Sequence, residues 1–84
     1  MFSISYSNQA HKFLKKGEKI LIIRLLEKIE RLKTEQVPHD SKVLEGSNKV
    51  FRVRVGNYRI LYEIYYEESL IVIVKIEKRS KAYD

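Results

Sequence analysis

The stretch KVFRVRVGNYRILYEI, residues 49 to 64, carries two arginines inside a run of apolar residues and decides the fold. Alternate residues of a β-strand point to opposite faces of its sheet. The residues that share one face are Phe51, Val53 and Val55, and those that share the other are Arg52 and Arg54. The pattern predicts a strand over residues 50–55 with one apolar face and one cationic face.

Gly56 and Asn57 predict a tight hairpin turn directly after this strand. A two-residue turn places Arg54 opposite Arg59 on the next strand. Like charges that oppose one another destabilise a sheet by about 0.2 to 1 kcal/mol per pair. The repulsion between the opposed guanidinium groups must therefore be offset, either by acidic neighbours or by an anionic ligand.

The alternation continues through two more expected strands. Their expected core-facing residues are Tyr58, Ile60, Tyr62 and Ile64, followed by Leu70, Val72, Val74 and Ile76. These two sets share one side only if the connecting loop has an odd number of residues, and residues 67–69 are the natural candidate. This register places Glu77 opposite Arg59, and it places Arg79 on the cationic side if the strand extends that far.

Two explanations of the cationic side follow. Glu77 and Glu63 lie on the same face as the arginines and offer a salt-bridge network that offsets their repulsion. Alternatively, the arginines bind an anion, and guanidinium groups suit phosphate because they hold it through two parallel hydrogen bonds. We favour the anionic ligand because four arginines face only two acids.

The N-terminal half predicts a strand and two helices. Apolar residues alternate with serines over residues 2–7, and Ser7 or Asn8 then supplies a helix N-cap. Gly17 and Glu18 interrupt this helix, after which a second helix is expected with an apolar face and a charged, solvated face. The apolar face comprises Ile22, Leu25, Leu26, Ile29 and Leu32, and the charged face comprises Arg24, Glu27, Lys28 and Arg31. Residues 35–49 form a connection in which Val43 and Leu44 are expected to contact the core.

The composition fits a folded basic protein, with 84 residues, 44% of them hydrophobic, and a net charge of +6. The positive electrostatic field of such a protein attracts polyanions. The absence of cysteine excludes disulfides and thiolate metal sites, and neither His11 nor His39 has a second metal-ligating residue at helical or strand spacing. The longest apolar run, LIVIV, is too short to span a bilayer. We expect one domain, a soluble intracellular protein and no metal.

The motifs GNYRILY and KRSKAY, after a strand and a helical hairpin, resemble the RelE family of toxin ribonucleases within the RelE/ParE superfamily. The similarity extends over essentially the whole chain, so residues 1–84 are expected to be a single RelE-like toxin domain. The resemblance implies an α+β fold, in which an N-terminal strand and a two-helix hairpin accompany a small, mostly antiparallel four-stranded sheet. The helices would pack on one face of the sheet, and the catalytic face would lie opposite.

The resemblance also implies an activity, the cleavage of mRNA in the ribosomal A site without metal or small-molecule cofactor. The ribose 2′-hydroxyl would attack its own phosphate, which requires a base, charge stabilisation and a proton for the departing 5′-oxygen. The residues that match the family's catalytic positions are Arg52, Arg54, Arg59, Arg79 and Tyr83. The lysines expected to contact RNA are Lys49, Lys75, Lys78 and Lys81.

The general base stays open at this point. Family members often have lysine where this chain has Arg52 and Arg54, and a guanidinium with a pKa above about 12 does not give up its proton. Tyr83 is the first candidate for proton transfer, because neighbouring cations favour its phenolate. Lys78 and Lys81 are weaker candidates. The alternative role of Tyr83 is to stack on a flipped base.

Two other functions stay open beside the ribonuclease. The superfamily includes toxins that inhibit DNA gyrase and lack the ribonuclease residues, and a noncatalytic basic RNA-binding module would share the same charge distribution. The partners implied are a cognate acidic RelB-like antitoxin that wraps the toxin as a largely helical strap, and a 70S-type ribosome with its mRNA. No membrane partner is expected, and the expected location is the cytoplasm.

Overall fold

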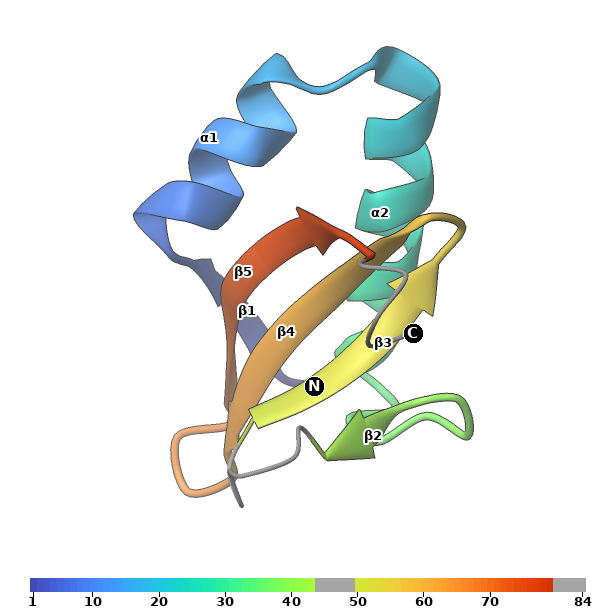
Figure 1. Cartoon of the computed structure of the whole chain (residues 1–84). Coiled ribbons are helices and arrows are strands. Elements are labelled where there is room, and N and C mark those ends of the chain that lie inside the picture. The colour runs from blue at the N-terminus through green and yellow to red at the C-terminus, as the bar shows by residue number, and fades with distance from the viewer. Residues whose placement is uncertain (44–49, 80–84) are drawn as a thin grey trace.

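The computed structural model describes residues 1–43 and 50–79, which form a five-stranded mixed sheet and two helices (Figure 1). The elements in chain order are β1 (Ser3–Tyr6), α1 (Asn8–Lys16), α2 (Lys19–Leu32), β2 (Lys42–Val43), β3 (Val50–Val55), β4 (Tyr58–Tyr65) and β5 (Leu70–Lys78). Their order across the sheet is β1-β5-β4-β3-β2, with β1 parallel to β5 and the other neighbours antiparallel. The expected α+β fold is confirmed, with one more strand, the two-residue β2, than the sequence predicted.

Side chains at the ends of the helices set their limits. The Ser7 hydroxyl accepts a hydrogen bond from the Ala10 amide at 3.1 Å and donates one to the Val74 carbonyl at 2.6 Å. The first bond caps α1, and the second ties the start of the helix to β5. Gly17 ends α1, and the Glu18 carboxylate caps α2. Of the two N-cap candidates, Ser7 and Asn8, the structure has Ser7, and the expected break at residues 17 and 18 is confirmed.

Both helices cover the same face of the sheet, with α1 over β5 and α2 beside β3 (Figure 1). The fully buried helical residues are Ala10, Leu25, Ile29 and Leu32, and the buried sheet residues packed against them are Val53, Val55, Ile60, Tyr62, Ile71, Ile73 and Ile76. Tyr62 donates its hydroxyl to the Gln36 carbonyl at 2.8 Å, and burial raises the pKa of Tyr62 to about 12. The opposite side of the sheet, which neither helix covers, is called the open face below.

The register of β5 differs from the sequence-based expectation. Ile71, Ile73 and Ile76 pair with the core residues of β4, so the predicted core set of Leu70, Val72 and Val74 was wrong. The loop has four residues, 66–69, instead of three, because β4 pairs through Tyr65 with Leu70. Ser69 closes the loop with a φ of 50°.

A β-bulge explains why the far end of β5 still matches the expectation. Leu61 pairs with Lys75 and Tyr62 pairs with Ile73, which leaves Val74 as an extra residue in β5. This residue shifts the alternation by one and returns Ile76 to the core. The predicted pairing of Arg59 with Glu77, which lies beyond the bulge, is therefore confirmed.

The segment that follows α2 is attached to the rest of the molecule through β2 and an ion pair, and not through the core contact of Val43 that the sequence predicted. Val43 is 51% exposed, so its predicted contact with the core was wrong, and Leu44 lies outside the described residues. The backbone pairing of β2 with β3 attaches this segment to the sheet edge. An ion pair of 2.6 Å between Lys28 and Asp40 joins it to α2.

Candidate functional site

The predicted arginines gather at one end of the open face, near the β3–β4 turn. Arg54 and Arg59 are direct cross-strand partners, and Arg52 lies two residues before Arg54 on the same face of β3. Arg79 follows β5, and its backbone amide donates to the Asn57 carbonyl at 2.7 Å. These four residues are called the arginine cluster below.

The turn between β3 and β4 holds this cluster in place. Gly56 has a φ of 58°, in the left-handed region that a two-residue hairpin turn requires and that glycine adopts without strain. The Arg79 guanidinium donates from Nη1 to the Gly56 carbonyl at 3.1 Å, so it lies against the turn. A substitution at Gly56 would therefore disturb the turn that opposes Arg54 to Arg59 and also the contact of Arg79.

Arg24 of α2 reaches the same turn, although its place on the charged face of the helix predicted a solvated side chain. A β-carbon on Gly56 would lie 3.4 Å from the guanidinium nitrogens of Arg24. A shallow hollow of about 270 Å³ lies between the arginine cluster and the charged face of α2, and the charged residues of its lining are Arg24, Glu27, Lys28, Arg31 and Arg54. The cationic surface therefore continues from the open face around the turn to α2. No periodicity in the sequence signals this, because it depends on how α2 lies against the hairpin.

Glu77 lies within the arginine cluster. The Nε atom of Arg59 donates to Oε2 of Glu77 at 2.5 Å, Nη2 of Arg59 contacts the same oxygen, and Nζ of Lys75 lies 3.2 Å from Oε1. Partial burial alone would raise the pKa of Glu77, but the hydrogen bonds from Arg59 and Lys75 outweigh it and hold the pKa below its usual value. Glu77 is thus the acid that offsets the repulsion between Arg54 and Arg59.

The second acid expected to balance the arginines lies elsewhere. Glu63 is near the far end of β4 and accepts a hydrogen bond from the Tyr65 hydroxyl at 2.9 Å. At the cluster itself, the described part of the chain sets the four arginines and Lys75 against the single carboxylate of Glu77. Among the described residues, the cluster therefore has more cationic than anionic side chains, as an anion site requires.

Of the remaining predicted residues, two lie in the described part of the chain. Lys75 is on the open face beside Glu77, whereas Lys78 pairs with Tyr58 and so lies on the helical side of the sheet. Lys49, Lys81 and Tyr83 lie outside the described residues. The RNA-contacting and catalytic roles assigned to all of these residues stay predictions.

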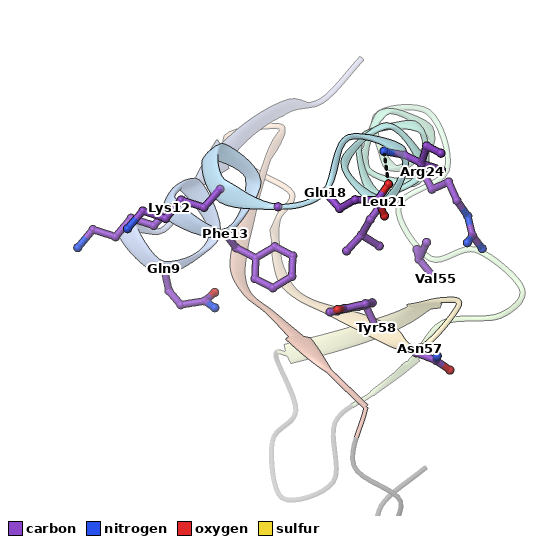
Figure 2. Close-up of a pocket in the computed structure, with 12 residues that line it drawn as sticks. Gln9, Lys12, Phe13, Glu18, Leu21, Arg24, Val55, Asn57 and Tyr58 are labelled. Atoms are coloured by element: carbon purple, nitrogen blue, oxygen red, sulfur yellow. Dashed lines mark hydrogen bonds between the residues drawn. The ribbon is translucent and has the colours of Figure 1, made fainter.

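A second feature, on the helical side, is a groove of about 700 Å³ between α1 and α2 above the β3–β4 turn (Figure 2). Its apolar lining comes from both helices and the hairpin and includes Phe13, Leu21, Val55 and Tyr58. The rings of Phe13 and Tyr58 meet edge to face with centroids 5.6 Å apart. The charged residues of its lining are Lys12, Lys16, Arg24 and Glu18. This interhelical groove is separate from the open face and carries a mainly basic rim.

The described residues, 1–43 and 50–79, also bear on metal sites and on membrane spans. They contain no group of three or more histidine, cysteine, aspartate or glutamate side chains that could hold a metal ion. Neither of their helices is long and apolar enough to cross a membrane.

Comparison with known proteins identifies the family. A family model described as the ParE toxin of type II toxin-antitoxin system, parDE, matches residues 4–83. The putative toxin RelE1 of Methanocaldococcus jannaschii is 35% identical over an alignment 85 positions long, which covers 98% of this chain and 94% of that protein. This chain belongs to the RelE family of toxins, within the RelE/ParE superfamily.

Solved RelE structures share the fold described above. RelE in the crystal structure of an archaeal RelE-RelB complex from Pyrococcus horikoshii OT3 matches with a TM-score of 0.83 and 29% identity, covering 95% of this chain and 97% of that one. The isolated E. coli RelE toxin matches with a TM-score of 0.83 and 17% identity, covering 99% and 92% of the two chains. At that lower identity the match shows the fold alone.

Proposed function

We propose that this RelE-family toxin inhibits translation by cleaving mRNA in the A site of a 70S-type ribosome. The observation that carries the proposal is the arginine cluster, because four guanidinium groups at one end of the sheet face that neither helix covers suit a phosphate on which negative charge develops. Residues 1–84 act in this proposal as a single RelE-like toxin domain, an endoribonuclease. Its substrate places it in the cytoplasm.

The proposed reaction is an attack of a ribose 2′-hydroxyl on the adjacent phosphorus. The O2′–P bond forms and the P–O5′ bond breaks, which leaves a 2′,3′-cyclic phosphate and a 5′-hydroxyl. Arg54, Arg59 and Arg79 stabilise the charge on the non-bridging oxygens as it increases toward the transition state. Arg52 and Lys75 extend the contact along the RNA backbone, and the same kind of contact is proposed for Lys49, Lys78 and Lys81.

Primer extension on mRNA tests the function. Purified toxin should cut mRNA within programmed ribosomes and leave the same RNA essentially intact without ribosomes, since one small sheet face has little room both to shape an RNA and to supply a full acid–base pair. Absence of cleavage in the ribosome would contradict the proposal.

Gyrase inhibition is the second candidate function, because the matching family model is described for ParE toxins. A supercoiling assay with purified gyrase, run beside the primer extension, decides between the two. Inhibition of supercoiling without RNA cleavage selects the gyrase inhibitor. Binding to RNA with neither effect selects a noncatalytic RNA-binding module.

Tyr83→Phe is expected to separate two roles proposed for the C-terminal tyrosine. The substitution keeps the aromatic ring and removes the hydroxyl. If the hydroxyl transfers a proton, the single-turnover rate should fall about 100-fold, the scale of general acid–base catalysis, with unchanged binding to the ribosome. A rate close to that of the unmodified toxin would show that the ring stacks on a base instead.

An acidic RelB-like antitoxin is the proposed protein partner. Solved relatives from Pyrococcus horikoshii OT3 and Methanococcus jannaschii, 29% and 25% identical, are described as RelE-RelB and RelB-RelE complexes. The net charge of +6 and the basic rim of the interhelical groove favour an acidic partner with apolar side chains. If the toxin alone does not impair growth at high expression and no partner copurifies from its native host, this proposal fails.

Ile20→Glu is expected to weaken binding of that antitoxin about tenfold, or about 1.4 kcal/mol. Ile20 lines the interhelical groove and is 68% exposed, so the change adds a negative charge facing an acidic partner without opening the core. Ile23→Glu is the matched control, because Ile23 is on the same helix, 49% exposed and outside the groove lining. Calorimetric titration that finds equal affinities for both variants would place the antitoxin elsewhere.

A further inference from the structure

The proposed cleavage needs a group that takes the proton of the attacking 2′-hydroxyl, and the arginines do not supply it. A guanidinium has a pKa above about 12 and stays protonated. At the arginine cluster, residues 50–79 offer one carboxylate, that of Glu77. Carboxylates serve as general bases in proton transfer.

Glu77 has the position that a base in this cluster requires. It pairs with Arg59 across β4 and β5 on the face opposite the buried Ile76, so its side chain is on the open face. The side chain is 22% exposed, which leaves it accessible to a ligand. Both contacts from Arg59 fall on Oε2, whereas Oε1 has the longer, 3.2 Å contact with the more exposed Lys75. The carboxylate is therefore oriented, and Oε1 is its less tightly held oxygen.

We propose that Glu77 is the general base of this toxin and accepts the 2′-hydroxyl proton while Arg59 holds the phosphate. The inference rests on the proposed ribonuclease function and adds a residue to it. As the O2′–P bond forms, the proton passes to the Glu77 carboxylate. As the P–O5′ bond breaks, the departing oxygen takes a proton from water, and the hydroxide that remains is neutralised when Glu77 releases its proton.

Substrate binding prepares Glu77 for this step. The charged groups near it are Arg59 from β4, Arg54 from β3, Lys75 from β5 and Arg79 beyond β5. An RNA phosphate competes with Glu77 for the Arg59 guanidinium. As the phosphate shares the Arg59 guanidinium with Glu77, the hydrogen bonds that lower the pKa of Glu77 weaken, and its proton affinity increases in the complex that reacts.

The pH dependence of the unmodified toxin is the first test. Because Glu77 is ionised throughout the neutral range, the single-turnover rate in programmed ribosomes should be nearly constant between about pH 6 and 8. A base with a pKa above this range, such as a tyrosine or a lysine, would make the rate increase about tenfold per pH unit. A tenfold increase per unit would overturn the proposal.

Substitution gives a second, independent test. Glu77→Gln keeps the shape of the side chain and cannot accept a proton, so the single-turnover rate should fall about 100-fold at saturating toxin. Glu63→Gln is the matched control, because it removes a carboxylate from the same strand pair away from the cluster and should leave the rate unchanged. A Glu77→Gln rate within threefold of the unmodified toxin would overturn the proposal.

Chemical rescue distinguishes a base from a residue that merely orients Arg59. Glu77→Ala leaves space for a small carboxylate. Added formate should therefore raise the single-turnover rate of this variant at least tenfold, whereas an equal concentration of chloride should not. Loss of rate in both variants with no recovery in formate would assign Glu77 to positioning and overturn its role as a base. If the unmodified toxin itself does not cleave ribosome-bound mRNA, that result contradicts the proposed ribonuclease function and, with it, the role of Glu77 as a base.

Discussion

Replacing Arg59 by alanine is expected to slow the cleavage of ribosome-bound mRNA by about 100- to 1,000-fold, the cost typical of losing one preorganised donor to a developing oxyanion. Arg59 combines two features of such a donor. Its guanidinium is fixed by the Glu77 carboxylate before any ligand arrives, and Arg54 lies directly opposite it across the hairpin. The measurement is the single-turnover rate at saturating toxin.

Lys19→Ala is the control for the loss of one positive charge, because Lys19 begins α2, which lies on the helical side of the sheet. The cleavage rate of this variant should equal that of the unmodified toxin. Cleavage by Arg59→Ala at the unmodified rate would show that the arginine cluster has only a structural role.

The effect of Arg59→Ala on stability follows from Glu77. Opposed arginines alone would predict an unchanged or slightly more stable fold, since the substitution relieves their repulsion. The structure adds a largely buried ion pair, in which the side chains of Arg59 and Glu77 are 16% and 22% exposed. Losing Arg59 leaves Glu77 with fewer partners, so the expected result is a destabilisation of about 1 to 3 kcal/mol. The variant should still fold.

Ile73→Ala is expected to have the largest effect on stability, a loss of about 2 to 5 kcal/mol. Ile73 is fully buried between the sheet and the helices, and truncating it leaves a cavity among close-packed neighbours. A protein of this size is stable by only about 5 to 15 kcal/mol, so the loss should be clear in urea unfolding.

Val72→Ala is the matched comparison, because Val72 directly precedes Ile73 on β5, pairs with Glu63 and so faces the other side of the sheet. The loss of stability in this variant should be smaller, about 1 kcal/mol. Equal losses, or a larger loss for Val72→Ala, would contradict the register of β5 and restore the core set expected from the sequence.

Sequence determined the β3–β4 hairpin because its turn is unambiguous. Gly56 and Asn57 admit one short turn, and once it is fixed the alternation of residues 50–65 opposes Arg54 to Arg59. The β4–β5 connection has no glycine or proline to mark its limits, and LIVIV is apolar at every position. Alternation therefore cannot assign a face there, and the four-residue loop and the bulge at Val74 both escaped prediction.

The candidate site was predictable to a similar extent. Strand parity placed Arg52, Arg54 and Arg59 on one face and paired Arg59 with Glu77, whereas the role of each residue in cleavage came from the resemblance to RelE. The approach of Arg24 to Gly56 and the interhelical groove depend on the angles at which the helices cross the sheet. Those angles follow from tertiary packing, which no local pattern in the sequence encodes.

The chemical nature of the new RNA ends tests the central claim most directly. Attack by the 2′-hydroxyl at the arginine cluster predicts that mRNA cut in programmed ribosomes carries a 2′,3′-cyclic phosphate on the upstream fragment and a 5′-hydroxyl on the downstream one. Mass spectrometry of the upstream fragment, together with labelling of the downstream fragment by polynucleotide kinase without prior phosphatase treatment, reads out both ends. A 3′-hydroxyl paired with a 5′-phosphate would contradict this account, because water and not the ribose would then have attacked the phosphate.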